Sequence, residues 1–422
     1  MHKINLIIIL LPIVLGIQAQ TIISPEVHAD STVTFRYSNE KAVTVRLRSD
    51  CLLRKPDNSW FGGKMRTQRM VCDSAGIFSL TTKPLEPEVY QYRFIVNGIY
   101  RHDPYNRDSA YVLLHQESIV AVGGNVQADL YVETADIPHG TIDTLLYYNE
   151  EQQLTRKILV YLPPYHTGYT VETEHIVETA PSDRESVANK EHVQSQESVA
   201  NKEHVVETEH VQSLQEYDDG GINMLYLLHG ISGDEASWIE LGRVKQILDN
   251  MLSQGKIEPT IVVMPDCNVK NKLTPKHRTN LFRNILNYPI LGKGDFEEAF
   301  PDMHRFVCGH YGLRPDKQHC YIAGLSSGAK QAANIVRDNP ELFSIVGLFS
   351  PVLGKKQLPT SSQSAVWHLY VGKADMFYKN GVRQYDRLQN AGAQCTLTEQ
   401  SGGHVWRNWR IFLTDFLTTL PE

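Results

Sequence analysis

Two kinds of hydrophobic pattern divide this chain of 422 residues. Between residues 21 and 124, apolar and polar residues alternate with a period of two, and an Asn-Gly pair at 97–98 stands where a hairpin turn is expected. The clearest alternating runs are Val33/Phe35/Tyr37, Val43/Val45/Leu47 and Tyr90/Tyr92/Phe94/Val96. Short strands separated by turn residues predict a small all-β sandwich over residues 21–124.

After Gly140 the pattern changes to short apolar runs that alternate with helix-like stretches. Strands are predicted at 157–162, 224–228, 261–264, 320–323, 345–349 and 367–371, and helices at 242–254, at 296–311, after 328 and after His404. Near-continuous apolar strands separated by helices are typical of a mostly parallel sheet that is covered on both faces. Residues 125–422 are therefore predicted to form an α/β domain.

The first 20 residues have the pattern of a signal peptide. A short basic start is followed by an apolar run at 6–17 and by small and polar residues at 18–20. The apolar run is shorter than the roughly 20 residues that a membrane-spanning helix needs. We expect export to the periplasm or the exterior, removal of residues 1–20, and no membrane span in the mature protein.

A low-complexity insertion interrupts the α/β domain at residues 168–220. The sequence Glu-Ser-Val-Ala-Asn-Lys-Glu-His-Val occurs at 185–193 and again at 197–205. Polar repeats without aromatic residues cannot bury enough apolar surface to offset the entropy of ordering. We predict a mobile surface insertion and attribute its histidines to duplication, with no metal site.

Composition and charge narrow the class of partner. The chain is 41% hydrophobic and 21% charged, as in globular proteins, and its formal net charge is −7 without a basic stripe. Nucleic acid is therefore excluded as a partner. The six cysteines lack metal-ligand spacing and are predicted to be buried as small apolar residues, although a Cys51–Cys72 bridge is left open.

The strongest chemical signal is the sequence Gly-Leu-Ser-Ser-Gly at residues 324–328. It lies between the apolar run 320–323 and a helix-like stretch, which is the strand, turn and helix context of a nucleophile elbow. Small residues on both sides of the turn allow the tight bend that presents a serine hydroxyl above the sheet. Ser326 is predicted to be the nucleophile that attacks a carbonyl carbon.

An acid and a base follow this serine in the chain order that the elbow requires. His404 lies in a glycine-softened turn before the last helix and is predicted to be the general base. Asp375 ends the apolar run that begins near Trp367 and is predicted to orient the imidazole. The alternative for Asp375 is a role as a helix N-cap.

Two main-chain donors are predicted to bind the oxyanion. One is the N–H of Ser327, directly after the nucleophile, and the other is the N–H of Ile231 in the loop after the strand 224–228. His229 is then expected to organise that loop. This chemistry is predicted to need neither a cofactor nor a metal ion.

These motifs resemble carbohydrate esterase family one, which comprises the feruloyl and acetylxylan esterases and is similar in fold to esterase D and to siderophore esterases. The resemblance lies in residues 226–235, 262–266, 323–328 and 403–406 with Trp409-Arg410. It implies an α/β-hydrolase fold. The chain departs from the family at 327–329, where Ser-Gly-Ala replaces methionine and two glycines, and at 266–268, where Asp-Cys-Asn replaces the usual Asn-Gly.

The predicted sandwich resembles the immunoglobulin-like domain, related to glycan-binding modules, that precedes the catalytic domain in many secreted bacterial polysaccharide esterases. The resemblance lies in residues 24–26, 35–37, 87–94 and 103–106. The only tryptophan in this region is Trp60. A structural role and a glycan-binding role therefore both stay open.

The combined prediction is a secreted serine esterase that removes feruloyl or acetyl groups from plant-cell-wall polysaccharide such as xylan; the resemblance implies this substrate class. One alternative is hydrolysis of another ester, such as a siderophore trilactone, or acyl transfer to a sugar hydroxyl. A further alternative is a non-catalytic glycan-binding protein on a hydrolase scaffold.

Overall fold

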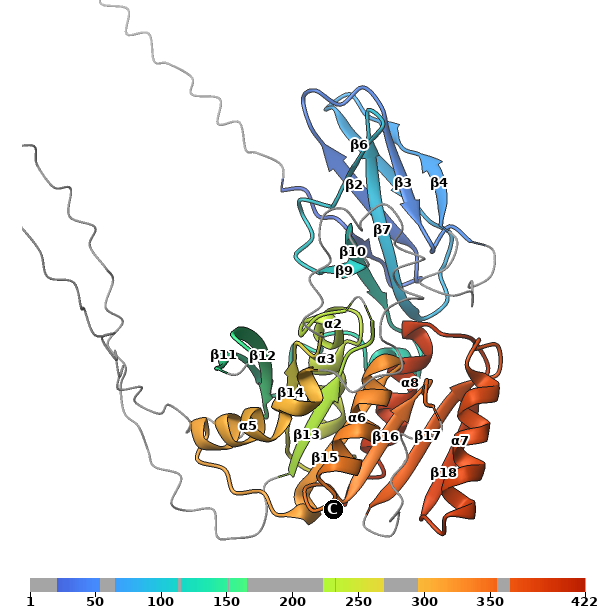
Figure 1. The fold of residues 1–422 in the computed structure, drawn as a ribbon. Helices are drawn as coiled ribbons and strands as arrows, with labels where there is room; N and C mark the ends of the chain where they lie inside the picture. Colours follow the sequence, from blue (N-terminus) through green and yellow to red (C-terminus); the bar gives the residue numbers. More distant parts are fainter. Residues whose placement is uncertain are drawn as a thin grey trace, which may run out of the picture.

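The computed structural model describes residues 21–53, 65–112, 115–150, 152–164, 223–231, 233–268, 295–354 and 365–421. These residues form an all-β domain that stands on an α/β domain (Figure 1). The predicted leader, residues 1–20, and the predicted insertion, residues 168–220, lie outside the described residues. Within the described part of the chain, no helix is long and apolar enough to cross a membrane.

The all-β domain consists of two antiparallel sheets. The first contains, in order, β1 (Glu26–Val27), β2 (Val33–Ser38), β6 (Ile77–Thr81) and β5 (Val71–Cys72). The second contains β4 (Arg66–Arg69), β3 (Val45–Ser49), β7 (Glu88–Val96), β10 (His115–Val122) and β9 (Ser109–Val112), with β8 (Ile99–Arg101) paired to β7. The all-β prediction is confirmed, and the immunoglobulin-like assignment stays a prediction.

Alternation along these strands places one set of side chains in a shared core. Phe35 and Tyr92 meet edge to face at a centroid distance of 4.6 Å, and both side chains are fully buried. The predicted turn at Asn97 and Gly98 joins β7 to β8, with φ values of 49° and 85°. Positive φ at both positions is the type I′ geometry that Asn-Gly favours.

Two cysteines of this domain were candidates for a bridge. Cys51 is buried, Cys72 is exposed, and both are free thiols. The bridge that the sequence left open is therefore not formed in this structure.

The α/β domain is built on an eight-stranded sheet. The strand order is β11 (Thr141–Asn149), β12 (Leu154–Leu162), β14 (Thr260–Pro265), β13 (Asn223–Leu228), β15 (Cys320–Leu325), β16 (Ile345–Phe349), β17 (Val366–Gly372) and β18 (Cys395–Gln400). β11 and β12 pair antiparallel to their neighbours, and the strands from β14 to β18 are parallel. The mostly parallel α/β sheet is confirmed.

Alternate residues of the central strands contribute side chains to two hydrophobic cores, one on each face of the sheet. Tyr226 of β13 belongs to the core on the face that is covered by α5 (Asp295–His310), α6 (Ser327–Asp338) and α7 (Tyr378–Asn390). Leu227 packs with α2 (Ser237–Glu240), α3 (Val244–Ser253) and α8 (Trp406–Leu417) on the opposite face. In the register of β13 and β15, Leu228 is opposite Gly324, so the loops after these strands leave the sheet at the same level.

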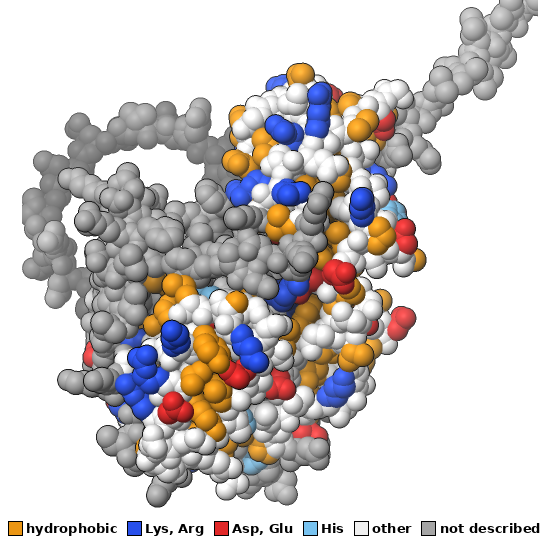
Figure 2. Space-filling view, turned by 90° about the vertical axis from the view of Figure 1, so that its right-hand side faces the viewer, with side chains coloured by type: hydrophobic (Ala, Val, Ile, Leu, Met, Phe, Trp, Pro, Cys, Tyr) orange, Lys and Arg blue, Asp and Glu red, His pale blue; other side chains and the backbone are white. Residues whose placement is uncertain are grey.

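The core that contains Leu227 continues into the all-β domain. It includes Val89 and Ile119 from that domain and Tyr131 from the connecting segment, which carries the short helix α1 (Val126–Asp129). Burial of apolar side chains across the boundary stabilises one arrangement of the two domains. On the face shown in Figure 2, basic and acidic side chains are interspersed over both domains.

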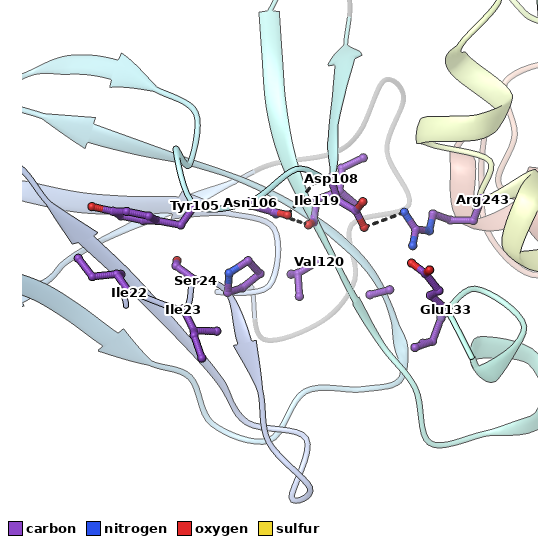
Figure 3. A pocket seen from close by; sticks show the side chains of 13 residues that line it. Ile22, Ile23, Ser24, Tyr105, Asn106, Asp108, Ile119, Val120, Glu133 and Arg243 are labelled. Carbon is purple, nitrogen blue, oxygen red and sulfur yellow. Dashed lines mark hydrogen bonds and ion pairs between the residues drawn. The ribbon is translucent and has the colours of Figure 1, made fainter. Parts of the chain in front are cut away.

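A cavity of about 430 Å³ lies along this boundary, and its lining includes residues of both domains (Figure 3). Arg243, directly before α3, has a left-handed φ of 56° and an almost fully buried side chain. Its Nη1 lies 3.0 Å from Asp108 Oδ2 of the all-β domain, and its Nε donates to Tyr131 O. This ion pair joins the domains at one side of the cavity.

Candidate active site

Ser326 stands in the sharp turn between β15 and α6. Its φ of 54° and ψ of −113° form a backbone conformation that costs a non-glycine residue on the order of 1–3 kcal/mol. The Ser326 N–H donates to Phe349 O at 2.8 Å, which ties the turn to β16. The surrounding sheet therefore holds Ser326 in a strained, defined position.

Two glycines make this turn sterically possible. A Cβ atom on Gly324 would lie 2.5 Å from the carbonyl carbon of Gly328, and one on Gly328 would lie 2.3 Å from His229 O. Both distances are too short for a side chain. Close backbone packing therefore explains why glycine occupies both positions: Gly324 packs against the turn itself, and Gly328 packs against the loop after β13.

The structure brings Ser326, His404 and Asp375 together in a hydrogen-bonded row. Ser326 Oγ lies 3.0 Å from His404 Nε2, and His404 Nδ1 lies 2.9 Å from Asp375 Oδ2. All three residues are buried, with 6%, 4% and 6% of their surface exposed, respectively. These distances are those of a nucleophile, a base and an orienting carboxylate.

Asp375 uses its two carboxylate oxygens differently. While Oδ2 faces His404, Oδ1 accepts a hydrogen bond of 2.8 Å from the N–H of Phe377, just before α7. Burial opposes ionisation, but the hydrogen bond and charge of His404, with hydrogen bonds from Ser350 and Phe377, hold the pKa of Asp375 below its usual range. Asp375 is not the N-cap of α7, which is Phe377, so the helix-cap alternative is wrong; Oδ1 instead accepts a hydrogen bond in the turn before the helix.

Aromatic rings surround the imidazole of His404. Phe377 and Trp409 each meet it edge to face, at centroid distances of 5.1 Å and 4.9 Å. Trp409 Nε1 donates to Ser350 Oγ at 3.1 Å, and the Ser350 hydroxyl is one of the groups that lower the pKa of Asp375. Sequence reasoning missed this support. Trp409 could have been suspected from its place after the predicted base, whereas nothing in the sequence marked Ser350.

The predicted oxyanion donors lie beside the nucleophile. Ser327 is the first residue of α6, so its N–H has no acceptor inside the helix. In the loop after β13, a Cβ built on Gly230 would lie 3.5 Å from Ser326 Cβ, and Ile231 follows directly. The geometry thus places the Gly230–Ile231 peptide next to Ser326, and the assignment of its N–H as a donor stays a prediction.

His229 holds this loop through a set of buried hydrogen bonds. Its Nδ1 donates to Gly230 O at 2.8 Å, and its Nε2 accepts the Cys267 N–H at 3.1 Å, the pattern of a neutral ring protonated at Nδ1. Asn268 Nδ2 donates to Gly233 O, and Gln331 Nε2 donates to Cys267 O. The departure from the family at 266–268 therefore forms part of the support for the loop.

The described residues contain no group of three or more His, Cys, Asp or Glu side chains that could hold a metal ion. The repeat histidines lie in the segment that the structure leaves undescribed. The row of Ser326, His404 and Asp375 consists of protein groups alone.

Comparison with known proteins agrees with this geometry. Residues 210–375 match the model of a family described as putative esterase. The fold is esterase-like. The matched segment contains Ser326 and Asp375, while His404 lies beyond it.

One curated relative is the endo-1,4-beta-xylanase/feruloyl esterase of Xylanibacter ruminicola. It is 25% identical over 356 residues, which is 82% of this chain and 40% of the relative. The chain therefore spans less than half the length of this relative.

Two of the solved structures that resemble this chain have low sequence identity to it. The enterobactin esterase of Shigella flexneri is 14% identical with a TM-score of 0.53, and the match covers 92% of this chain and 93% of that one. A ferulic acid esterase of Anaeromyces mucronatus is 17% identical with a TM-score of 0.45, covering 69% and 94%.

Proposed function

We propose that this protein is a serine carboxylic ester hydrolase in which Ser326, His404 and Asp375 form the catalytic triad. The proposal depends above all on the two hydrogen bonds of 3.0 and 2.9 Å that join these side chains. The match of residues 210–375 to an esterase family supports the same reaction class.

The geometry allows a two-step acyl transfer. His404 Nε2 takes the hydroxyl proton as Ser326 Oγ attacks the ester carbonyl, and Asp375 stabilises the imidazolium that forms. The N–H groups of Ser327 and Ile231 bind the oxyanion of the tetrahedral intermediate. His404 then protonates the leaving alcohol, and water releases the acid from the acyl-enzyme by the reverse proton transfers.

We propose acylated plant-cell-wall polysaccharide as the substrate, with feruloyl or acetyl groups on xylan as the bonds cleaved. The sequence resemblance and the printed name of the curated relative support this class. The signal-peptide pattern of residues 1–20 supports secretion or a periplasmic location. In this proposal the all-β domain, residues 21–124, is an accessory to the esterase domain, residues 125–422.

A siderophore ester is the competing substrate. The fold match to the enterobactin esterase covers 92% of this chain and so includes the all-β domain as well as the hydrolase sheet. Since that likeness concerns fold alone, the two substrate classes must be separated by experiment.

The decisive experiment compares the wild type with Ser326→Ala and the control Ser327→Ala on p-nitrophenyl acetate and methyl ferulate. Ser326→Ala is expected to lose on the order of a thousandfold or more in kcat. Ser327→Ala keeps its main-chain N–H and should stay within a few-fold of the wild type. Equal rates for Ser326→Ala and wild type would overturn the esterase proposal and favour a binding role.

Substrate class is tested on the same protein samples. Release of ferulate and of acetate from arabinoxylan is measured beside hydrolysis of a catecholate trilactone. Release from arabinoxylan at the higher kcat/KM supports the polysaccharide proposal. Preference for the trilactone would replace it with a siderophore ester.

A further inference from the structure

Helix α8 is fastened to the all-β domain by a buried ion pair. Glu88 is the first residue of β7, and its Oε1 lies 2.6 Å from Arg410 Nη2 while its Oε2 lies 2.7 Å from Arg407 Nε. Only 7% of Glu88 and 3% of Arg410 is exposed. A buried charge of this kind is tolerated when its partner is present and is costly when the partner is removed.

The position of this ion pair on α8 matters because Arg407 is the second residue of the helix. A cation in the first turn is disfavoured by the helix dipole, which is positive at that end. The Glu88 carboxylate supplies the negative charge that the first turn needs. The all-β domain therefore contributes directly to the stability of the N-terminal end of α8.

The same end of α8 holds the loop that carries His404. Asn408 Nδ2 donates to Gly403 O at 3.1 Å. Gly402, with φ of 99°, lies so close that a Cβ there would be 2.6 Å from Asn408 Oδ1. Any displacement of the first turn of α8 is thus transmitted to the residues just before His404.

A second connection runs through the aromatic rings. Trp406 and Trp409 meet edge to face at 5.2 Å, and Trp409 contacts the imidazole of His404. Trp406 also meets Trp238 of α2 at 5.3 Å. Because these rings contact one another and the imidazole, a shift of the first turn of α8 is expected to move His404.

We propose that Glu88 is a positioning residue for the active site: through Arg407 and Arg410 it fixes the first turn of α8 and thereby the distance between His404 and Ser326. The inference rests on the proposed function, because it assigns Glu88 a part in keeping the triad aligned. It gives the all-β domain a role in catalysis that needs no contact with substrate.

The test compares Glu88→Gln with the matched control Glu117→Gln. Glu117 is a buried carboxylate of the same domain, with 4% of its surface exposed, and it pairs with Arg93 at 3.0 Å; among the described residues, no ion pair joins it to α8. Both variants remove one buried negative charge from the all-β domain. They differ in whether the lost charge faces α8.

Three quantities are measured well below the unfolding temperatures of all variants: kcat and KM for methyl ferulate, and the rate at which a fluorophosphonate labels Ser326. Glu88→Gln is expected to lower kcat and the labelling rate about tenfold with KM changed less than about twofold, since misalignment of about 1 Å can cost a hundredfold. Glu117→Gln should keep both rates. Glu88→Asp, which retains the charge, should recover part of the loss.

Arg407→Gln removes only the more exposed of the two arginine partners of Glu88. This variant replaces Glu88→Gln if Glu88→Gln does not fold, and it should lower kcat about threefold. Wild-type kcat in Glu88→Gln, or in Arg407→Gln where that variant replaces it, would overturn the positioning role. An equal loss in Glu117→Gln would also overturn it. Failure of the esterase proposal is distinguishable, because Ser326→Ala would then match the wild type.

Discussion

The turn that carries Ser326 and the loop that carries His404 are held in position by different kinds of contact. Ser326 is fixed by its own neighbourhood in the sequence, through Gly324, Gly328 and a main-chain bond to β16. His404 is fixed by the nearby Trp409 and by side chains that come from distant parts of the chain, including Asp375 and, through α8, Glu88. The serine is therefore held by local backbone geometry, and the histidine by long-range packing.

The largest effect that separates the two regions is expected for Asp375→Asn. Asparagine keeps an oxygen for the Phe377 N–H, so the turn before α7 survives, but the imidazole loses its orienting charge. We expect kcat to fall on the order of 10⁴-fold while the unfolding temperature changes little. Steady-state kinetics with p-nitrophenyl acetate and thermal unfolding measure the two quantities. If the unfolding temperature also falls strongly, the loss of kcat reflects a role of Asp375 mainly in folding.

Gly328→Ala tests the elbow. The added methyl group meets His229 O and Leu228 O, which are main-chain atoms and cannot move aside without shifting β13. We expect the free energy of unfolding to fall by about 1–3 kcal/mol, and kcat to fall about a hundredfold because the serine and the oxyanion loop move apart. Urea unfolding and kcat for methyl ferulate check this. Gly309→Ala, at an exposed glycine of α5 where an added Cβ meets no atom within 4 Å, is the control for the added methyl group.

Trp409→Phe tests how Trp409 supports His404 without leaving a large cavity beside the imidazole. Phenylalanine keeps an aromatic face near His404 but loses the indole N–H that donates to Ser350. We expect a loss of about 1 kcal/mol in the free energy of unfolding and about a fivefold fall in kcat. If kcat stays at the wild-type value while stability falls, the Ser350 contact has no part in orienting Asp375.

The smallest expected effect concerns pH. Burial raises the pKa of Asp50, close to Glu88 and Arg407, to about 7. A carboxyl group whose folded pKa lies above its unfolded value contributes stability at low pH, and this contribution is lost as the pH rises through about 7. Asp50→Asn should therefore raise the unfolding temperature by a few degrees at pH 8.5 and leave it nearly unchanged near pH 4, because the loss begins once the pH exceeds the unfolded pKa of 3.8. The same change at both pH values would contradict a raised pKa.

Much of the α/β sheet could be predicted because its central strands are continuous apolar runs. β16 matched the predicted range 345–349 to the residue. β18 was missed because it is an edge strand whose residues are half-buried or exposed, so its sequence lacks a hydrophobic run. α7 was not predicted either, since only three of its residues, Gly381, Gln384 and Leu388, are buried.

The same reasoning explains what could be predicted of the site. Two glycines at fixed spacing make Ser326 recognisable in the sequence. The structure places His404 and Asp375 within hydrogen-bonding distance of the partners predicted for them. Ser350 and Glu88 could not be found, because their importance lies in contacts with residues 59 and 322 positions away along the chain. Long-range side-chain contacts leave no periodic signal in a single sequence.

The register between β13 and β15 limits where residues can be inserted into or deleted from this protein. With Leu228 opposite Gly324, the peptide at 230–231 and the hydroxyl at 326 project from neighbouring strands at one height. Gaining or losing a single residue within either strand would turn alternate side chains toward the wrong core and pull the two groups out of line. Variation in length is therefore expected only in the connections between the strands, and not within β13 or β15.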